Sequence, residues 1–169
     1  MLLASKLKLD RLGKQLVEQV AYNISTMDTG QYLPASQREK MAASVRYELD
    51  EEEFRLVGGE YIWTYETGRG PTVNPGDGAV RRYVLEYIRE EGIEPRGQDK
   101  RGLPIDESTL AYFISRKIHQ EGSKPWRTGQ PTGVISEIIN EKLLTNVEAM
   151  LTEAYAAEVA GFLLETIEA

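Results

Sequence analysis

Three side chains carry groups suited to acid–base catalysis: Glu66, Asp77 and His119, which is the only histidine in the sequence. Glu66 follows an aromatic residue and stands two positions before a glycine. A carboxylate in such a turn can transfer protons, or it can accept backbone N–H groups and hold a sharp bend. Gly68 and Gly70 favour the second role, because glycines let the backbone curl its N–H groups toward a carboxylate. We therefore predict that Glu66, Gly68 and Gly70 fix the loop that follows.

Other catalytic signals in the sequence are weak. The glycine-rich loop 68–78 lacks the Gly-Lys-Ser/Thr of a phosphate loop, and no acidic residue follows it in the pattern of a dinucleotide site. A single histidine near the end of a predicted helix is typical of a surface position. The absence of cysteine excludes disulfides, thiolate zinc sites and cysteine nucleophiles. We predict no catalytic residue, no metal and no cofactor.

Two short amphipathic helices follow this loop, with Asp77 at the start of the first and His119 in the second. Their apolar residues recur on one face of a 3.6-residue repeat: Val80, Tyr83, Val84, Tyr87 and Ile88 in the first helix, and Leu110, Phe113, Ile114 and Ile118 in the second. Asp77 and Asp106 are placed to accept N–H groups of the first turns. Gly92 and Gly122 are placed to adopt the left-handed C-terminal cap.

Long helices are predicted at both ends of the chain. The first lies within residues 1–30, with an apolar stripe formed by Leu9, Leu12, Leu16, Val20, Ile24 and Met27. The second covers residues 134–168, with a stripe formed by Leu144, Val147, Leu151, Tyr155, Val159 and Phe162. A helical turn is expected at residues 35–40, in the connector after the first helix.

Residues 43–57 change to the two-residue repeat of a half-buried strand and predict a β-hairpin with its turn at 50–52. A single hairpin is not stable alone. It must pack on the helices or pair with strands of another copy, and the sequence leaves both open. The aromatic run that follows, Tyr61, Ile62, Trp63 and Tyr65, is expected to form the core between hairpin and helices. The predicted fold is thus a single α+β domain over residues 1–169, with long N- and C-terminal helices packed with a small antiparallel β element and two short helices.

Charge is unevenly distributed along the 169 residues, whose net charge is −7. Residues 68–127 carry a net charge of +2, whereas residues 128–169 carry −6. An acidic helix beside a mildly basic centre suits charge-complementary packing between copies, and it also suits a solvated acidic face. Neither pattern has the concentrated basic footprint of a nucleic-acid-binding protein. No apolar run reaches the roughly 20 residues of a membrane span, and the charges soon after Met1 argue against a signal peptide and favour a cytoplasmic protein.

Three polar loops hold the residues that core packing explains least. They cover residues 68–77, 94–104 and 122–132, and they contribute Arg69, Arg96, Lys100, Arg101, Trp126 and Arg127. Loops that combine an aromatic ring with arginine are typical interface anchors. We predict that these six residues contact partners.

The central block 61–124 also carries a resemblance to a known family. Its motifs are Tyr65-Glu66-Thr67-Gly68, Gly70-Pro71, Gly92-Ile93 and the run Leu-Ala-Tyr-Phe-Ile-Ser-Arg-Lys-Ile-His-Gln-Glu-Gly-Ser-Lys that ends at Lys124. This pattern resembles the tail-completion family of tailed bacteriophages, which includes minor tail proteins of the lambda Z type. It covers about the middle third of the chain, and the C-terminal helix matches less well.

The resemblance implies a non-enzymatic virion protein, a tail-completion or neck component that forms a homo-oligomeric ring at the head–tail junction. Its partners would be other phage neck and tail proteins, with no membrane and no sequence-specific nucleic-acid binding. It would be assembled in the host bacterial cytoplasm. Two alternatives are a different ring of the same junction, either the terminator or the head-closure protein, and a small hydrolase or nucleotide-binding enzyme that uses Glu66, Asp77 and His119.

Overall fold

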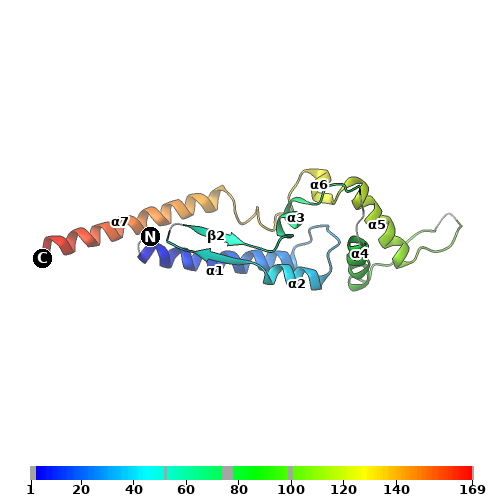
Figure 1. Cartoon of the computed structure of the whole chain (residues 1–169), viewed down its shortest axis with the longest axis horizontal. Helices are drawn as coiled ribbons and strands as arrows, with labels where there is room; N and C mark the ends of the chain where they lie inside the picture. The colour runs from blue at the N-terminus through cyan, green and yellow to red at the C-terminus, as the bar shows by residue number, and fades with distance from the viewer. Residues whose placement is uncertain (1–2, 52, 74–77, 99–100, 169) are drawn as a thin grey trace.

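The computed structural model describes residues 3–51, 53–73, 78–98 and 101–168, with side chains to Leu164. In chain order its elements are α1 (Leu3–Thr26), α2 (Ala35–Ala43), β1 (Arg46–Leu49), β2 (Phe54–Val57), α3 (Ile62–Thr67), α4 (Ala79–Glu90), α5 (Glu107–Glu121), α6 (Lys124–Thr128) and α7 (Glu141–Glu168). The molecule is elongated: α7 projects at one end, and the loop between α4 and α5 projects at the other (Figure 1). The predicted α+β fold with long terminal helices is confirmed.

The hairpin packs against α1. Its strands are antiparallel, with Tyr47 opposite Leu56. The Tyr47 hydroxyl donates a hydrogen bond to Asp10 Oδ1 at 2.6 Å. Gly13 brings the two elements close, because a Cβ there would lie 2.5 Å from the Tyr47 ring. Of the two arrangements that the sequence left open, packing on a helix is therefore present within the single chain.

Two separate groups of buried apolar side chains stabilise the chain. The first joins α1, the hairpin, α3 and the segment before α7 through Val20, Ile24, Val45, Tyr65 and Val134. The second lies between α4 and α5 and contains Val84, Ile88 and Ala111. We call the parts of the molecule around these groups the first and second lobes.

The expectation that the whole aromatic run belongs to the core is wrong for two of its members. Tyr65 is buried and Ile62 packs against the first core. Tyr61 and Trp63, in contrast, are 69% and 65% exposed. The reason is that Ile62–Thr67 forms a short helix, in which residues three and four apart share a face and their neighbours point away from it.

The C-terminal helix starts later than predicted, and most of its predicted apolar stripe is exposed. It begins at Glu141 rather than at residue 134. It runs antiparallel to α1: Ala4 N–H donates to Glu158 Oε1 at 2.7 Å, and Lys8 Nζ lies 3.3 Å from Glu153 Oε2. Ala154 on the side facing α1 is buried, whereas four members of the predicted stripe are exposed: Leu144, Tyr155, Val159 and Phe162. The apolar surface of α7 is wider than the surface that α1 covers.

The helix ends follow the predictions in part. Asp106 caps α5 by accepting from Thr109 N–H at 2.7 Å. Asp77 lies outside the described residues, and α4 begins after Gly78. Gly92 has the left-handed φ of 59° expected at a helix end. Gly122 has a φ of 86° but a ψ of 172°, so the chain leaves α5 extended rather than in the predicted left-handed cap. At the connector, α2 is longer than the turn expected at 35–40.

Gly13 offers a direct test of the packing between hairpin and α1. Replacing a glycine by alanine inside a helix normally raises stability by up to about 1 kcal/mol. Gly13→Ala should instead lower the free energy of unfolding by about 1–3 kcal/mol, because its methyl group would overlap the Tyr47 ring. Thermal and urea unfolding measure this difference.

The matched control is Gly161→Ala in α7, where no described neighbour lies within 4 Å of the added methyl group. It should cause no loss of stability. In a Tyr47→Ala background, Gly13→Ala should become stabilising. A Gly13→Ala protein as stable as the wild type would contradict the close approach of hairpin and helix.

Candidate functional site

A set of hydrogen bonds joins the loop after α3 to the end of α5 and the segment before α6. Arg69 N–H donates to Ser123 Oγ at 2.8 Å, and Ser123 N–H donates back to the Arg69 carbonyl at 2.8 Å. Thr72 N–H donates to the His119 carbonyl at 2.9 Å. Ser123 is buried within this contact. We call these paired segments, residues 68–72 and 119–126, the junction.

Glycines in the junction provide the surface on which α6 lies. A Cβ at Gly68 would lie 2.4 Å from Trp126 N, and one at Gly122 would lie 2.7 Å from Trp126 Cδ1. A Cβ at Gly70 would lie 3.2 Å from the same indole ring. Gly68 and Gly122 also have a φ of 86°, which side chains rarely adopt. Gly68 and Gly70 are therefore needed for the close approach of Trp126, and not for curling their N–H groups toward Glu66 as predicted.

Glu66 is 2% exposed, and its carboxylate binds a different segment from the one expected. Oε2 accepts from Thr132 Oγ1 at 2.9 Å and from Ile135 N–H at 3.0 Å. Oε1 accepts from Ser136 N–H at 3.1 Å. The Glu66 carbonyl accepts from Thr132 N–H at 2.8 Å. The side chain is thus an acceptor of backbone N–H groups, but it holds residues 132–136 rather than the loop 68–78.

The protonation state of Glu66 follows from these contacts. Burial alone would raise the pKa of its carboxyl group, because the charged form loses hydration. Hydrogen bonds from Ser136, Ile135 and Thr132 favour the charged form and outweigh burial, so the pKa is lowered. A carboxylate that is held charged by three donors is a poor general acid near neutral pH.

His119 is half-buried and hydrogen-bonded, not on the open surface that the sequence suggested. Its Nδ1 lies 2.6 Å from Thr72 Oγ1. Burial, with a smaller effect from the nearby charge of Arg69, lowers the pKa of His119. The described contacts do not join His119 to Glu66, and Asp77 lies outside the described residues. The acid–base group considered from the sequence is therefore not assembled by the described contacts.

The structure divides the predicted partner-contacting residues between two places. Arg69 and Trp126 lie in the junction, and Arg127 follows in α6, where its guanidinium lies 2.8 Å from a Glu121 oxygen. Trp126 is 55% exposed, with one part of its ring against glycine backbone. Arg96 and Arg101 are exposed in the loop that projects beyond α4 and α5 (Figure 1). Lys100 lies outside the described residues.

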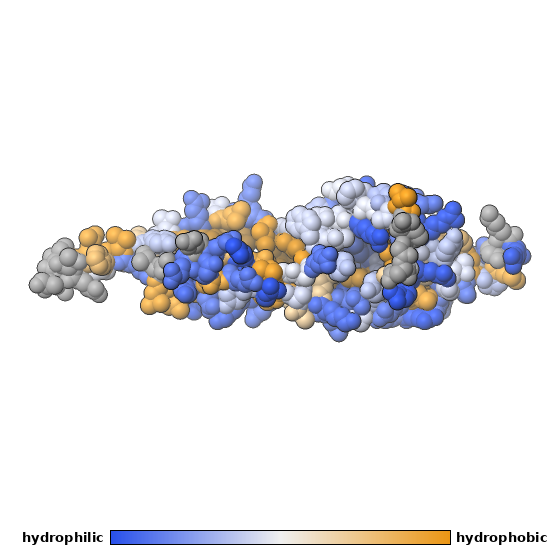
Figure 2. All heavy atoms as spheres, viewed as in Figure 1, coloured by the Kyte–Doolittle hydropathy of each residue, from blue (hydrophilic) through white to orange (hydrophobic). Residues whose placement is uncertain are grey.

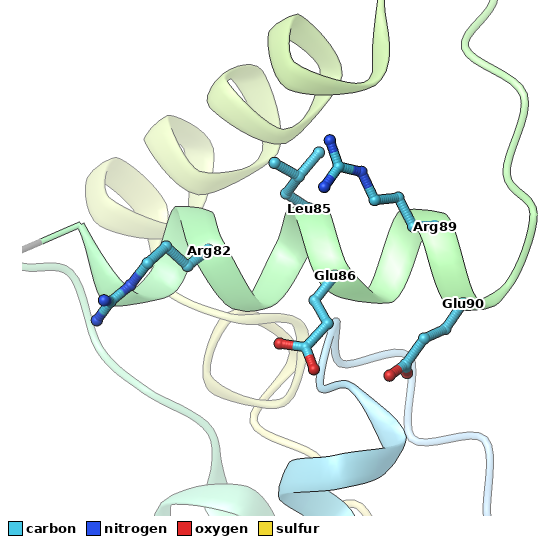
Figure 3. Close-up of a pocket in the computed structure, with 5 residues that line it drawn as sticks. All are labelled: Arg82, Leu85, Glu86, Arg89 and Glu90. Carbon is cyan, nitrogen blue, oxygen red and sulfur yellow. The ribbon is translucent and has the colours of Figure 1, made fainter.

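The contact that α2 and α4 make between the two lobes was not predicted from the sequence. Ala35 N–H at the start of α2 donates to Glu90 Oε2 at 2.7 Å, and Ser36 Oγ donates to Glu86 Oε1 at 2.9 Å. Pro34 precedes the helix and supplies no capping side chain, so Glu90 of α4 takes that role. Figure 3 shows Glu86 and Glu90 on one side of α4, lining a surface depression of about 370 Å³ with Arg82, Leu85 and Arg89. The sequence signal that could have predicted this contact is Pro34, which precedes α2 and has no side-chain group to cap it.

Comparisons with protein-family models, curated proteins and solved structures give no match for this chain. Within the described residues, no three His, Asp or Glu side chains gather where they could hold a metal ion. No described helix is long and apolar enough to cross a membrane.

Two Glu66 variants separate a structural acceptor from a proton-transferring group. Glu66→Gln keeps an oxygen for Thr132 and Ile135 but turns its amide toward Ser136 N–H, which should cost about 1–3 kcal/mol. Glu66→Ala leaves all three donors without their acceptor and should cost at least about 3 kcal/mol. Chemical unfolding at neutral pH measures both losses.

Acidification adds a second readout for the same variants. Because the folded-state pKa of Glu66 is lowered, its contribution to stability is complete above the unfolded value of about 4.3 and is lost as pH falls through the folded value. The stability difference between wild type and Glu66→Gln should therefore narrow on acidification. A stability difference that widens on acidification would count against the structural role of Glu66. So would an equal loss of assembly in Glu66→Gln and Glu66→Ala proteins that are both fully folded.

Proposed function

We propose that this protein is a structural subunit of a tailed-phage virion, a tail-completion or neck component that assembles as a homo-oligomeric ring at the head–tail junction. The motifs of the central block supply the phage assignment, which is a resemblance over part of the chain. The structure supports the more general part of the proposal, that the chain functions by associating with other chains.

The observation that carries the proposal is the large surface of the single chain. Its accessible surface is 11616 Å² for a mass of 19.0 kDa. A compact monomer of this mass exposes about 8,400 Å². The excess of about 3,200 Å² compares with roughly 800 Å² per partner in a standard interface. It is large enough for the two faces that each subunit of a ring must present to its neighbours.

The candidate catalytic groups support an assembly role over an enzymatic one. Glu66 is charged and engaged by three donors, and His119 is bonded to Thr72. Their partners are structural segments of the same chain. Among the predicted partner-contacting residues, Trp126, Arg96 and Arg101 are exposed, and tryptophan and arginine are enriched at interfaces.

Trp126→Ala tests whether the junction contacts a partner. We expect association to weaken by about 2 kcal/mol, which is about 30-fold in the dissociation constant. The melting temperature should fall only modestly, because Trp126 is 55% exposed and only part of its ring lies on the junction glycines. The matched control is Trp63→Ala, which removes the same group from a position that is 65% exposed on α3. A fall in melting temperature without any effect on association would make Trp126 a core residue instead.

Electron microscopy of the intact particle tests the proposed function itself. We expect several copies of this chain, related by a rotation axis, at the junction of head and tail. The position of the ring also separates a tail-completion protein from a terminator or head-closure protein. One copy per particle, or no copy in the particle, would overturn the proposal.

A further inference from the structure

We propose that the projecting end of α7 packs on the outer face of α1 in a second copy of this chain. The proposal rests on the proposed function only in requiring that copies associate. It names the two surfaces that meet, the turns of α7 beyond Glu158 and the first turns of α1.

Within the described residues, no helix lies beside the end of α7. The antiparallel pairing of α1 and α7 ends where Ala4 meets Glu158, one residue after α1 begins. Ten further helical residues, 159–168, continue past this point (Figure 1). At 1.5 Å per residue they extend for about 15 Å. Helices in proteins gain most of their stability from the packing of an apolar face, so a partner surface would stabilise these end turns.

Apolar side chains lie on this projecting segment and on the turn before it. Tyr155, in that preceding turn, and Val159 and Leu163, in the projecting segment, follow one another at four-residue steps, which places them on one face, and they are between 42% and 54% exposed. Leu164, on another side, is exposed as well. Figure 2 shows apolar residues at the surface of this end of the molecule. We call Tyr155, Val159 and Leu163 the α7 stripe.

The start of α1 offers a surface of matching character. Leu3 and Leu7 lie one turn apart on the side of α1 away from its core stripe, and both are well exposed. Lys6 and Arg11 are exposed beside them and make no ion pair in the described part of the chain. Residues 3–11 carry a net charge of +2, whereas residues 159–168, which project beyond Glu158, carry −2. Leu3 and Leu7, with Lys6 and Arg11, form the α1 face.

A second copy fits these two surfaces. Apolar residues of the α7 stripe can cover Leu3 and Leu7, while the acidic C-terminal segment lies near Lys6 and Arg11. The α1 face spans residues 3–11, which at 1.5 Å per residue is about 13 Å and is close to the length of the projecting turns. The contact cannot form within one chain, because α7 already passes Ala4 and continues away from Leu7.

Cross-linking between chains with different introduced cysteines tests the contact. The sequence contains no native cysteine, so only the introduced thiols can react. Leu7→Cys and Val159→Cys chains are mixed and treated with a short bismaleimide. We expect a product that contains one chain of each kind. The matched control is Tyr22→Cys, which is 66% exposed on α1 against 64% for Leu7 but lies outside the α1 face. It should give no such product with Val159→Cys.

Charge reversal adds an independent readout. Lys6→Glu combined with Arg11→Glu should abolish the mixed product, and rising salt should weaken it in the unreversed protein. Cross-linking of Val159→Cys chains to each other, with no product from the mixture, would overturn the inference in favour of pairing between two α7 helices. The absence of any cross-link would also overturn it.

A chain with both cysteines separates this inference from the proposed ring. A cyclic arrangement should give a ladder of products beyond the dimer. If the dimer is the largest product, the contact stands and the ring is wrong. If wild-type protein assembles in sedimentation experiments while no cross-link forms, the ring stands and the contact is wrong.

Discussion

The buried carboxylate of Glu66 is the interaction on which the arrangement of the chain depends. It is placed by α3, whose Tyr65 lies in the first core, and it binds the backbone of residues 132–136 just before α7. Gly68, two residues after Glu66, begins the junction, where glycines leave room for Trp126 and α6. The short stretch 65–70 therefore fixes the direction of α7 and the contact with the second lobe together. Removal of the carboxylate leaves buried N–H groups without an acceptor, which is more costly than the loss of an exposed ion pair.

The shape of the molecule connects this arrangement to its function. Two small cores, one around α1 and the hairpin and one between α4 and α5, are joined by the junction and by the contact of Glu86 and Glu90 with α2. Such a chain buries less surface than a single compact core would. Exposed large apolar residues lie on α7 and at the start of α1, and others lie on α3, α5 and α6. Large exposed apolar surfaces of this kind mark interaction sites.

Local sequence patterns predicted the elements that depend on local chemistry. The α1 stripe, the antiparallel hairpin, the α4 face and the Asp106 cap follow from spacing and residue type. The predicted α5 face is correct for Leu110, Ile114 and Ile118, whereas Phe113 is 47% exposed and Ala111 is buried instead. Contacts between distant segments were not accessible in this way. Glu66 lies 66 residues or more before the groups that donate to its carboxylate, and nothing in the sequence near either segment identifies the other. The exposed residues of α7 could not be predicted for the same reason. Apolar periodicity shows which face of a helix needs a partner, but it does not show whether that partner is in the same chain.

In a single chain the end of α7 projects without a helix packed beside it in the described part of the structure. Hydrogen exchange of the backbone amides in residues 159–164, followed over a range of protein concentration, tests it most directly. In dilute, monomeric protein these amides should exchange rapidly, because a projecting helix end opens locally at little cost. Protection should appear with assembly, while the amides of α1 near Val20 and Ile24 stay protected throughout. Strong protection of residues 159–164 in the monomer, unchanged by concentration, would contradict the account.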